Sequence, residues 1–454
     1  MVNDGAASPR VRRLRTGALA LLVVAGCVNY MDRSAVAVAN GPIRDSLGLS
    51  LGEMGLLLSS FAWAYGFAQL PAGMLVDRFG PRRVLGVGLV LWSLAQVGSA
   101  FSRSLAGFAF ARVALGLGES PMYTGGTRVC ADWYAERERT MPVAVFNASA
   151  SLGPAIAPAI LTGLMAAYGW RAMFVAIGVA GVAVAVAWVL LYRGPDAAGL
   201  SPDERAAISD RHGDAAPPGA TPPAPGVPAG TASGGAPDAA LGAQPPAASS
   251  APLRDVRRLL RRRTSWGMAL GFCGVIYMTW LYATWLPGYL QTQRHLDATA
   301  AGLLSSIPLA AGFVGALAGG WVAQRLGRAG MDPREACRWP VIVAMLGTAG
   351  FTVGGALAPG VAGSLALLSG GVFLANLASS CGWALGAVMA PPAEVGTLEA
   401  IQNVGGSLGG ALAPLVTGVV VQATGSFLPA LFLAAAVSVG SALAYATLVR
   451  APAK

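Results

Sequence analysis

The segment "GLLLSSFAWAYGFAQLPAGMLVDRFG", residues 55–80, has a second, altered copy later in the chain, "GLLSSIPLAAGFVGALAGGWVAQRLG", residues 302–327. Each copy is an apolar stretch that ends in an arginine and a glycine. A single offset aligns four residues of the first copy with four of the second: Gly55, Gly73, Arg78 and Gly80 with Gly302, Gly320, Arg325 and Gly327. A repeat that contains a whole apolar span indicates a chain built from two related halves, an architecture that is typical of secondary transporters.

The composition is that of an integral membrane protein. Of the 454 residues, 55% are hydrophobic and 11% are charged, and the mean hydropathy is +0.59, whereas soluble domains carry about a quarter charged residues. A helix that crosses a bilayer needs roughly 20 apolar residues. Twelve runs have this character: 17–39, 55–76, 84–102, 105–129, 141–167, 171–192, 266–290, 299–323, 337–358, 362–390, 399–423 and 427–449. We therefore predict an all-α membrane protein with twelve transmembrane helices in two pseudo-symmetric bundles of six.

The basic residues predict how the chain is oriented. They concentrate in alternate loops and at both ends of the chain, and the intervening loops hold only Arg44, Arg103, Arg171 and Arg294. This positive-inside bias places both termini and the long central loop in the cytoplasm, and we expect the bacterial inner membrane as the location. It also explains the net charge of +10 without nucleic-acid binding. The run after "RVRRLR" is too long for a cleavable signal and is predicted to be the first span.

These patterns divide the chain into five parts. We predict a cytoplasmic tail at 1–16, an N-terminal bundle at 17–193, a cytoplasmic linker at 194–264, a C-terminal bundle at 265–449 and a second tail at 450–454. The linker is rich in Pro, Ala, Gly and Ser, a composition that cannot bury a core, so we expect disorder there. It ends in the basic segment "RDVRRLLRRR", which either lies on the anionic inner leaflet or only sets the topology.

The loop "GMLVDRFGPRR", residues 73–83, joins the second and third spans. Gly73 is expected to let two helices pack closely, and Gly80 to permit a tight turn. Asp77, beside Arg78, can bond to a neighbouring helix end as a latch on one gate, and Arg82 is expected at the lipid surface. The alternative is a positively charged loop without a gating role.

This loop resembles the signature of the major facilitator superfamily, and "GGWVAQRLGRAG" resembles its weaker second copy, with Gln324 in place of the acid. Three further stretches resemble the anion:cation symporter family: "NYMDRS" in span one, "ARVALGLGESPMYTGGTRVCADWYAERERT" through span four and "WLPGYL" in span seven. Members of that family carry sugar acids and other organic acids. The resemblance covers nearly all of the chain outside the linker and the termini.

Five charged residues fall inside predicted spans of the N-terminal half: Asp32, Arg33, Arg112, Glu119 and Arg128. The spans of the C-terminal half are expected to contain none. A charge at this depth is costly and usually faces a cavity or a partner. Arg128 lies near a span end and is expected to have a structural role. The other four predict pairing between spans one and four, either as structural ion pairs or as a functional site.

The functional interpretation divides these four residues by their chemistry. Arginine keeps its proton, so Arg33 and Arg112 can grip a carboxylate, whereas Asp32 and Glu119 can titrate. A proton that neutralises an acid frees an arginine for an anion. Binding of the proton then strengthens binding of the anion, and the reverse, as symport requires. The family resemblance implies the same roles, with the acids for proton coupling and the arginines for the substrate.

Polar residues of other spans complete the predicted substrate site. Tyr30 lies three residues before Arg33, on nearly the same helix face. By resemblance, Tyr65, Ser380, Trp383 and Asn403 fall where sugar-acid members of the family bind substrate. Taken singly, each is explained equally well as a polar residue that stabilises the packing of neighbouring helices. Three aromatic residues of span seven either gate the outer mouth or form an aromatic belt, which we favour: Tyr277, Tyr282 and Trp285.

The sequence thus predicts proton-coupled uptake of an organic carboxylate by a monomer, with protons as the coupling ion and no other cofactor. "SLGPAIAP" in span five partly resembles a motif of proton-driven exporters, which are the alternative, and a non-transporting sensor is the third possibility. No nucleophile or metal motif points to an enzyme. The five cysteines lack metal-ligand spacing and are expected to be packing residues.

Overall fold

The computed structural model describes residues 8–134, 140–201, 204, 259–389 and 392–449. This part of the chain is helical and contains no strand. The helices of the first half are α1 (Pro9–Val38), α2 (Asn40–Leu47), α3 (Leu51–Phe79), α4 (Pro81–Ala100), α5 (Leu105–Glu119), α6 (Pro121–Trp133) and α7 (Thr140–Leu191). Those of the second half are α10 (Arg263–Thr292), α11 (Ala298–Arg328), α12 (Pro333–Leu357), α13 (Val361–Met389), α14 (Pro392–Thr424) and α15 (Phe427–Thr447).

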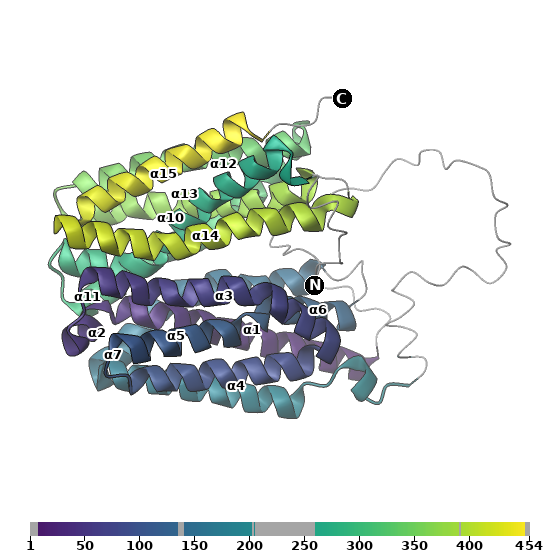
Figure 1. Cartoon of the computed structure of the whole chain (residues 1–454). Helices are drawn as coiled ribbons and strands as arrows, with labels where there is room; N and C mark the ends of the chain where they lie inside the picture. Colours follow the sequence, from purple (N-terminus) through teal and green to yellow (C-terminus); the bar gives the residue numbers. More distant parts are fainter. Residues whose placement is uncertain (1–7, 135–139, 202–203, 205–258, 390–391, 450–454) are drawn as a thin grey trace.

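The helices form two bundles that lie side by side, α1–α7 below and α10–α15 above in Figure 1. We call the end where α1 begins and α15 ends the termini side, and the opposite end the α2 side. The two described ends of the predicted linker, 194–264, lie at the termini side, and its residues 202–203 and 205–258 lie outside the described residues. Pro195–Ala197 forms a 3-10 turn, and α10 begins at Arg263, slightly before the predicted boundary.

Nine helices of the described chain are long and apolar enough to cross a membrane, and the bent pair α2–α3 raises this number to ten. Helix α7 counts once among them, although Gly169, at φ 80° and ψ 164°, breaks it into helical segments 140–168 and 170–191. The break falls between the two spans predicted at 141–167 and 171–192. Twelve spans remain a prediction.

The predicted span at 105–129 is interrupted once, and Ser120 at the interruption keeps helical backbone angles, φ -55° and ψ -33°. The structure has two helices, α5 and α6, separated at Ser120. Pro121 follows directly, and proline has no N–H for the helix ladder and clashes with the preceding turn. The break places Glu119, the last residue of α5, at an interruption between two helices.

Helix α3 begins and ends with residues that suit its termini. Its first turn carries a capping box, in which the Ser50 hydroxyl accepts a bond from the Glu53 N–H and the Glu53 carboxylate accepts one from the Ser50 N–H. It ends at Gly80, whose φ of 78° lies in the region that only glycine adopts without strain. The predicted tight turn at Gly80 is confirmed, and Pro81 starts α4 directly after it.

The two bundles pack tightly at the α2 side. A Cβ on Gly55 of α3 would lie 2.7 Å from the Pro414 carbonyl and 3.0 Å from the Gly418 Cα of α14, so only glycine fits there. In the same region the Gln422 side chain accepts a 3.0 Å hydrogen bond from the Leu51 N–H. Gly73, nearer the termini side of α3, meets no described atom within 4 Å of an added Cβ. The expectation that Gly73 packs closely against a helix is therefore wrong for this conformation.

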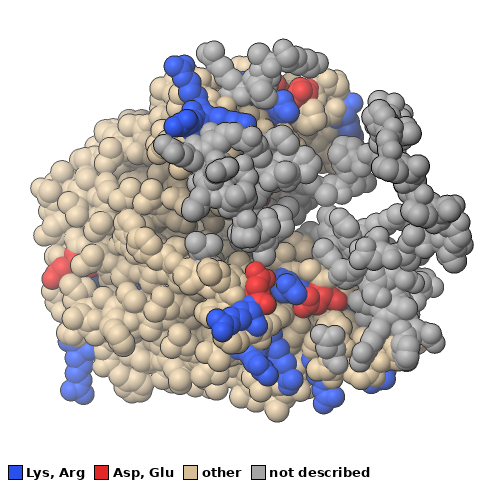
Figure 2. Space-filling view, turned by 45° about the vertical axis from the view of Figure 1, so that its right-hand side comes forward, with Lys and Arg blue, Asp and Glu red and all other residues tan. Residues whose placement is uncertain are grey.

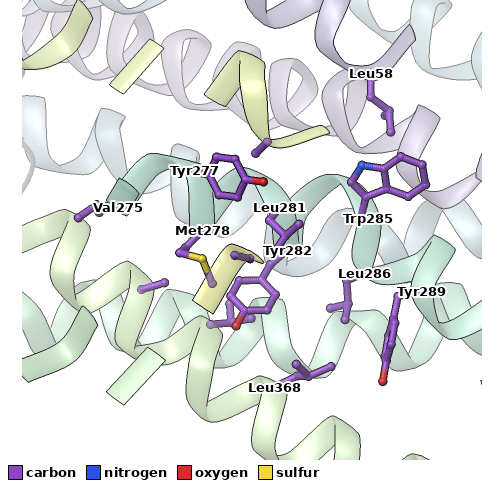
Figure 3. Packing of buried hydrophobic residues seen from close by; sticks show 14 of the residues in the cluster. Leu58, Val275, Tyr277, Met278, Leu281, Tyr282, Trp285, Leu286, Tyr289 and Leu368 are labelled. Carbon is purple, nitrogen blue, oxygen red and sulfur yellow. The ribbon is translucent and has the colours of Figure 1, made fainter. Parts of the chain in front are cut away.

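The favoured aromatic belt on α10 is also wrong. Tyr277, Tyr282 and Trp285 are all buried, and Figure 3 shows them pointing between neighbouring helices. The Trp285 indole donates to the Pro414 carbonyl at 3.0 Å, and the Tyr282 hydroxyl lies 2.7 Å from that of Thr352. Leu58 of α3 lies toward Trp285 in the same core cluster, which therefore continues from one bundle into the other.

Candidate substrate cavity

A cavity of about 380 Å³ lies between the two bundles and is lined by helices of both. All seven residues predicted to bind substrate line it: Tyr30, Arg33, Tyr65, Arg112, Ser380, Trp383 and Asn403. They come from five helices and from both halves of the chain. The structure therefore brings together what the sequence placed far apart, and the individual binding roles remain predictions.

Arg33 is held by an ion pair and by three aromatic rings. Its Nε donates to Glu119 Oε2 at 2.7 Å, which joins α1 to α5 and confirms the predicted pairing of spans one and four. Its guanidinium carbon lies 4.9 Å from the ring centre of Tyr30, 5.0 Å from that of Phe61 and 4.5 Å from that of Tyr65. Cation–π attraction stabilises a cation in such a cage and fixes its direction.

Arg112 is the second cation of the cavity wall. Its side chain is 2% exposed, and its guanidinium carbon lies 4.9 Å from the Phe61 ring centre, so both arginines contact this phenylalanine. The Nε and Nη1 groups of Arg112 are buried without a hydrogen-bond partner in the described chain. A buried guanidinium with unused donors is costly, and an anion in the cavity that Arg112 lines would place a counter-charge beside it.

The two acids lie behind the arginines. Asp32 is 1% exposed and Glu119 is fully buried, and neither is among the residues that line the cavity. Both Asp32 oxygens and Glu119 Oε1 lack a hydrogen-bond partner within the described residues. Arg33 and Arg112 are the charged residues of the described cavity wall. The wall is therefore cationic on the N-terminal side, with titratable groups directly beneath it.

The wall formed by the second bundle is neutral and polar. One face of α13 presents Asn376, Ser379, Ser380 and Trp383 to the cavity. The Ser380 hydroxyl donates to the Ala316 carbonyl at 2.9 Å, and the Asn376 amide donates to the Val372 carbonyl at 2.9 Å. Sequence reasoning missed Asn376, although it lies four residues before Ser380 and so on the same helix face.

Two amide side chains bridge the bundles at the cavity. Asn403 Nδ2 of α14 donates to Gln69 Oε1 of α3 at 3.0 Å, and both residues line the cavity. Gln69 was not predicted, although it follows Tyr65 by one helical turn. Gln402, adjacent to Asn403, instead points into its own bundle, where its amide donates to the Gly382 carbonyl at 3.1 Å.

Comparison with known proteins decides the family. Residues 22–331 match the Major Facilitator Superfamily. The chain belongs to this superfamily. It is 38% identical, over 98% of its own length and 91% of the relative's, to a probable L-galactonate transporter of Escherichia coli K12. It is 30% identical to a D-galactonate transporter of E. coli O6:H1, over 98% and 97% of the two chains.

A third relative is described as the transporter of a different organic acid. A probable sulfoacetate transporter of Cupriavidus necator is 30% identical over 95% of this chain and 93% of the relative. The crystal structure of a bacterial homologue of the human lysosomal transporter Spinster, inward-facing and unoccupied, superimposes with a TM-score of 0.71. At 17% identity, over 98% of this chain and 95% of that one, it confirms the superfamily fold. The protein is a multi-pass transporter of the major facilitator superfamily and not an enzyme.

The superfamily loop at 73–83 makes the contacts expected of a latch. Asp77 Oδ1 lies 3.5 Å from Arg128 Nη1, which joins α3 to α6, and Arg128 also pairs with Asp132 at 2.9 Å. Arg82 is not only a lipid-surface residue, because its Nη2 donates to the Val189 carbonyl near the end of α7 at 3.0 Å. Arg78 lies 5.2 Å from the ring centre of Phe79. The gating role of the loop remains a prediction.

Charged residues mark the termini side of the transporter. Figure 2 turns this side forward, and most of the blue and red atoms in the view gather there, beside a broad tan flank. The expectation that the spans of the C-terminal half contain no charge is wrong. Glu399 of α14 is buried, and its side chain packs against Gly386 of α13, so the C-terminal half does contain an acid within a span.

The remaining chemistry-bearing residues do not cluster. No group of three His, Cys, Asp or Glu residues in the described chain has the arrangement of a metal site. The five cysteines are free: Cys130, Cys337 and Cys381 are buried, and Cys27 and Cys273 are half-buried. The thiols therefore pack among helices, as the sequence predicts.

Proposed function

We propose that this protein is a proton-coupled importer of a hydroxylated organic carboxylate, a sugar acid such as an aldonate, working by alternating access. One observation carries the proposal. Two arginines line the cavity, whereas the two acids that can titrate are buried away from it, and one of them, Glu119, pairs with Arg33. A carboxylate in the cavity therefore meets fixed cations, while the proton sites are shielded from it.

The ion pair between Arg33 and Glu119 supplies the coupling. As long as Glu119 is ionised, it holds the Nε of Arg33 and neutralises its charge. Protonation of Glu119 weakens this bond and leaves Arg33 for the substrate carboxylate, which arginine binds through two parallel hydrogen bonds. The proton and the anion then favour the same loaded state, and each raises the affinity for the other by the same factor. Asp32, near the second arginine, is proposed as a second proton site.

The polar wall and the relatives support a sugar acid. Hydroxyl groups of such a substrate can bond to the amides and hydroxyls of Asn376, Ser379 and Asn403. Two relatives that match 98% of this chain are described as galactonate transporters. An exporter of cationic drugs is disfavoured, because both charged residues of the described cavity wall are arginines.

We further propose twelve spans in a bacterial inner membrane, with the termini in the cytoplasm and the protein acting as a monomer. The break at Gly169 divides α7 into two spans, and α5 and α6 together make one. The excess of arginine on the termini side follows the positive-inside rule. The bundles are then closed toward the periplasm at Gly55 and Gly418.

Reconstituted protein tests the proposal. Proteoliposomes with an inward-directed proton gradient (acidic outside) should accumulate radiolabelled galactonate, and a protonophore should abolish the accumulation. A panel of organic acids that produces no proton-dependent uptake would reject the function. Efflux of protons against entry of a cationic compound would favour the exporter instead.

A further inference from the structure

The bridge between Gln69 and Asn403 is a hydrogen bond that joins the two bundles, as does the bond between Leu51 and Gln422 at the α2 side. Unlike that second bond, it lies on the cavity wall. Both amides are half-buried and are therefore within reach of a ligand.

The bridge stands where the two central helices begin to separate. Along the antiparallel pair α3 and α14, Gly55 faces Gly418, and an added Cβ on Gly66 would lie 3.4 Å from the Ser407 Cβ. Gln69 then bonds to Asn403, and the next glycine of α3, Gly73, meets no described atom within 4 Å. The amide bridge is thus at the termini-side end of the tight contact, next to the part of α3 and α14 where the two helices diverge.

The hydrogen-bonding capacity of the bridge matches a hydroxyl group. Each amide has an oxygen that accepts and an NH₂ that donates. The bond between them uses one oxygen and one N–H. Whichever amide donates, one free oxygen and one free NH₂ remain for the cavity. A hydroxyl group can donate to the first and accept from the second, whereas a methyl group would leave both unsatisfied.

The position of Gln69 along α3, relative to the arginines, limits which hydroxyl group of a bound acid can reach it. The Arg33 guanidinium carbon lies 4.5 Å from the Tyr65 ring centre, and Gln69 is one turn further along α3, about 6 Å away. A substrate whose carboxylate meets Arg33 therefore brings a remote part of its chain to Gln69. The hydroxyl groups on carbons 4 to 6 of an aldonate are the ones remote from its carboxylate, and a three-carbon acid has none of them.

We propose that Gln69 is a specificity residue that, together with Asn403, binds a hydroxyl on carbon 4, 5 or 6 of a six-carbon sugar acid. This inference rests on the proposed function, because it assumes a carboxylate at the arginines. It adds a binding site for the remote end of the substrate, and each bundle contributes one residue to this site. Binding at the bridge also ties substrate occupancy to the contact that holds the bundles together.

A substrate series tests the proposal on the purified full chain. Calorimetry would compare galactonate with its 4-, 5- and 6-deoxy analogues, for the native protein and for Gln69→Leu. In the native protein, one deoxy acid should bind about tenfold or more weakly than galactonate. Gln69→Leu should bind galactonate about that much more weakly and show no further loss with the same deoxy acid. Asn403→Ala should behave alike.

The control is Gln402→Leu, which removes a neighbouring amide that points away from the cavity. Its deoxy-to-galactonate ratios should equal those of the native protein, even if the variant is less stable. Identical ratios in the native protein and in both Gln69→Leu and Asn403→Ala would overturn the inference and leave the proposed function standing. Absence of any aldonate binding by the native protein would overturn both.

Discussion

Arg33 and Glu119 form a 2.7 Å ion pair in which the arginine lines the cavity and the glutamate does not. Their side chains are 11% and 0% exposed, respectively, so the pair has a ligand-facing member and a shielded member. Stability alone does not account for the pair, since replacing a buried ion pair by apolar residues is often neutral or stabilising. The asymmetry suits a pair that exchanges partners during transport.

Replacement of Glu119 by glutamine separates coupling from binding. The glutamine oxygen can still accept from Arg33, but the side chain cannot titrate. Uptake driven by a pH gradient should fall at least about tenfold, while counterflow exchange of unlabelled for labelled substrate stays within about threefold. Glu53→Gln, which changes an acid of the α3 cap, should affect neither assay strongly. Equal loss of both activities in Glu119→Gln would instead assign Glu119 to binding or structure.

Arg33→Lys tests the geometry of the carboxylate site. Lysine keeps the charge but lacks the planar fork that bonds a carboxylate through two N–H groups and stacks on aromatic rings. Affinity for the substrate should fall about ten- to a hundredfold, measured by calorimetry at fixed pH. Arg103→Lys, at an exposed position of the same bundle, is the matched control. Near-native affinity in Arg33→Lys would reject a bidentate grip.

Charge and helical periodicity were sufficient to predict much of this site. Five charges in apolar spans are too costly to be accidental, and three of them do converge: Arg33 contacts Glu119 directly and shares the Phe61 ring with Arg112. Arg128 was expected near a helix end and pairs there with Asp77. In these cases the free-energy cost of a charged side chain within an apolar span made a specific partner predictable.

Residues whose position in the sequence carries no such free-energy cost were not predicted. Gln69 is one amide in an apolar helix, a pattern that packing explains equally well, and its partner Asn403 lies in the other bundle. Glu399 stands at the first position of a predicted span, where a charge normally meets water, yet the neighbouring Gly386 leaves room to bury it. The aromatic residues of α10, including Trp285, face inward because of how the bundles pack, which local sequence does not encode.

Asp77→Asn tests the latch at the loop. The Asp77 and Arg128 side chains are about half exposed, so the loss of their pair should change the free energy of unfolding by no more than about 1 kcal/mol. We nevertheless expect the transport rate to fall several-fold, because the pair joins α3 to α6. Asp132→Asn is the comparison, since Asp132 contacts Arg128 from the same helix. An unchanged rate in Asp77→Asn would favour a loop that only sets topology.

The α3–α14 register predicts what the opposite conformation must contain. Gly55 faces Gly418, Gly66 faces Ser407 and Gln69 bonds to Asn403. Continuing the register brings Gly73 opposite Ala400, which is exposed in this conformation. Alternating access requires the bundles to separate at the α2 side and approach at the termini side, so Gly73 and Ala400 should then come into contact.

Leucine at each glycine should therefore have opposite consequences. Gly55→Leu places atoms where a Cβ alone would lie 2.7 Å from a backbone carbonyl, so it should force the bundles apart at the α2 side. Gly73→Leu fits the present conformation but blocks the approach to Ala400, so transport should be lost with the conformation retained. Spin labels at Asp45 and Thr299, on different bundles at the α2 side, should report a longer distance in Gly55→Leu and an unchanged one in Gly73→Leu. Native transport by Gly73→Leu would show that α3 and α14 do not close at this position.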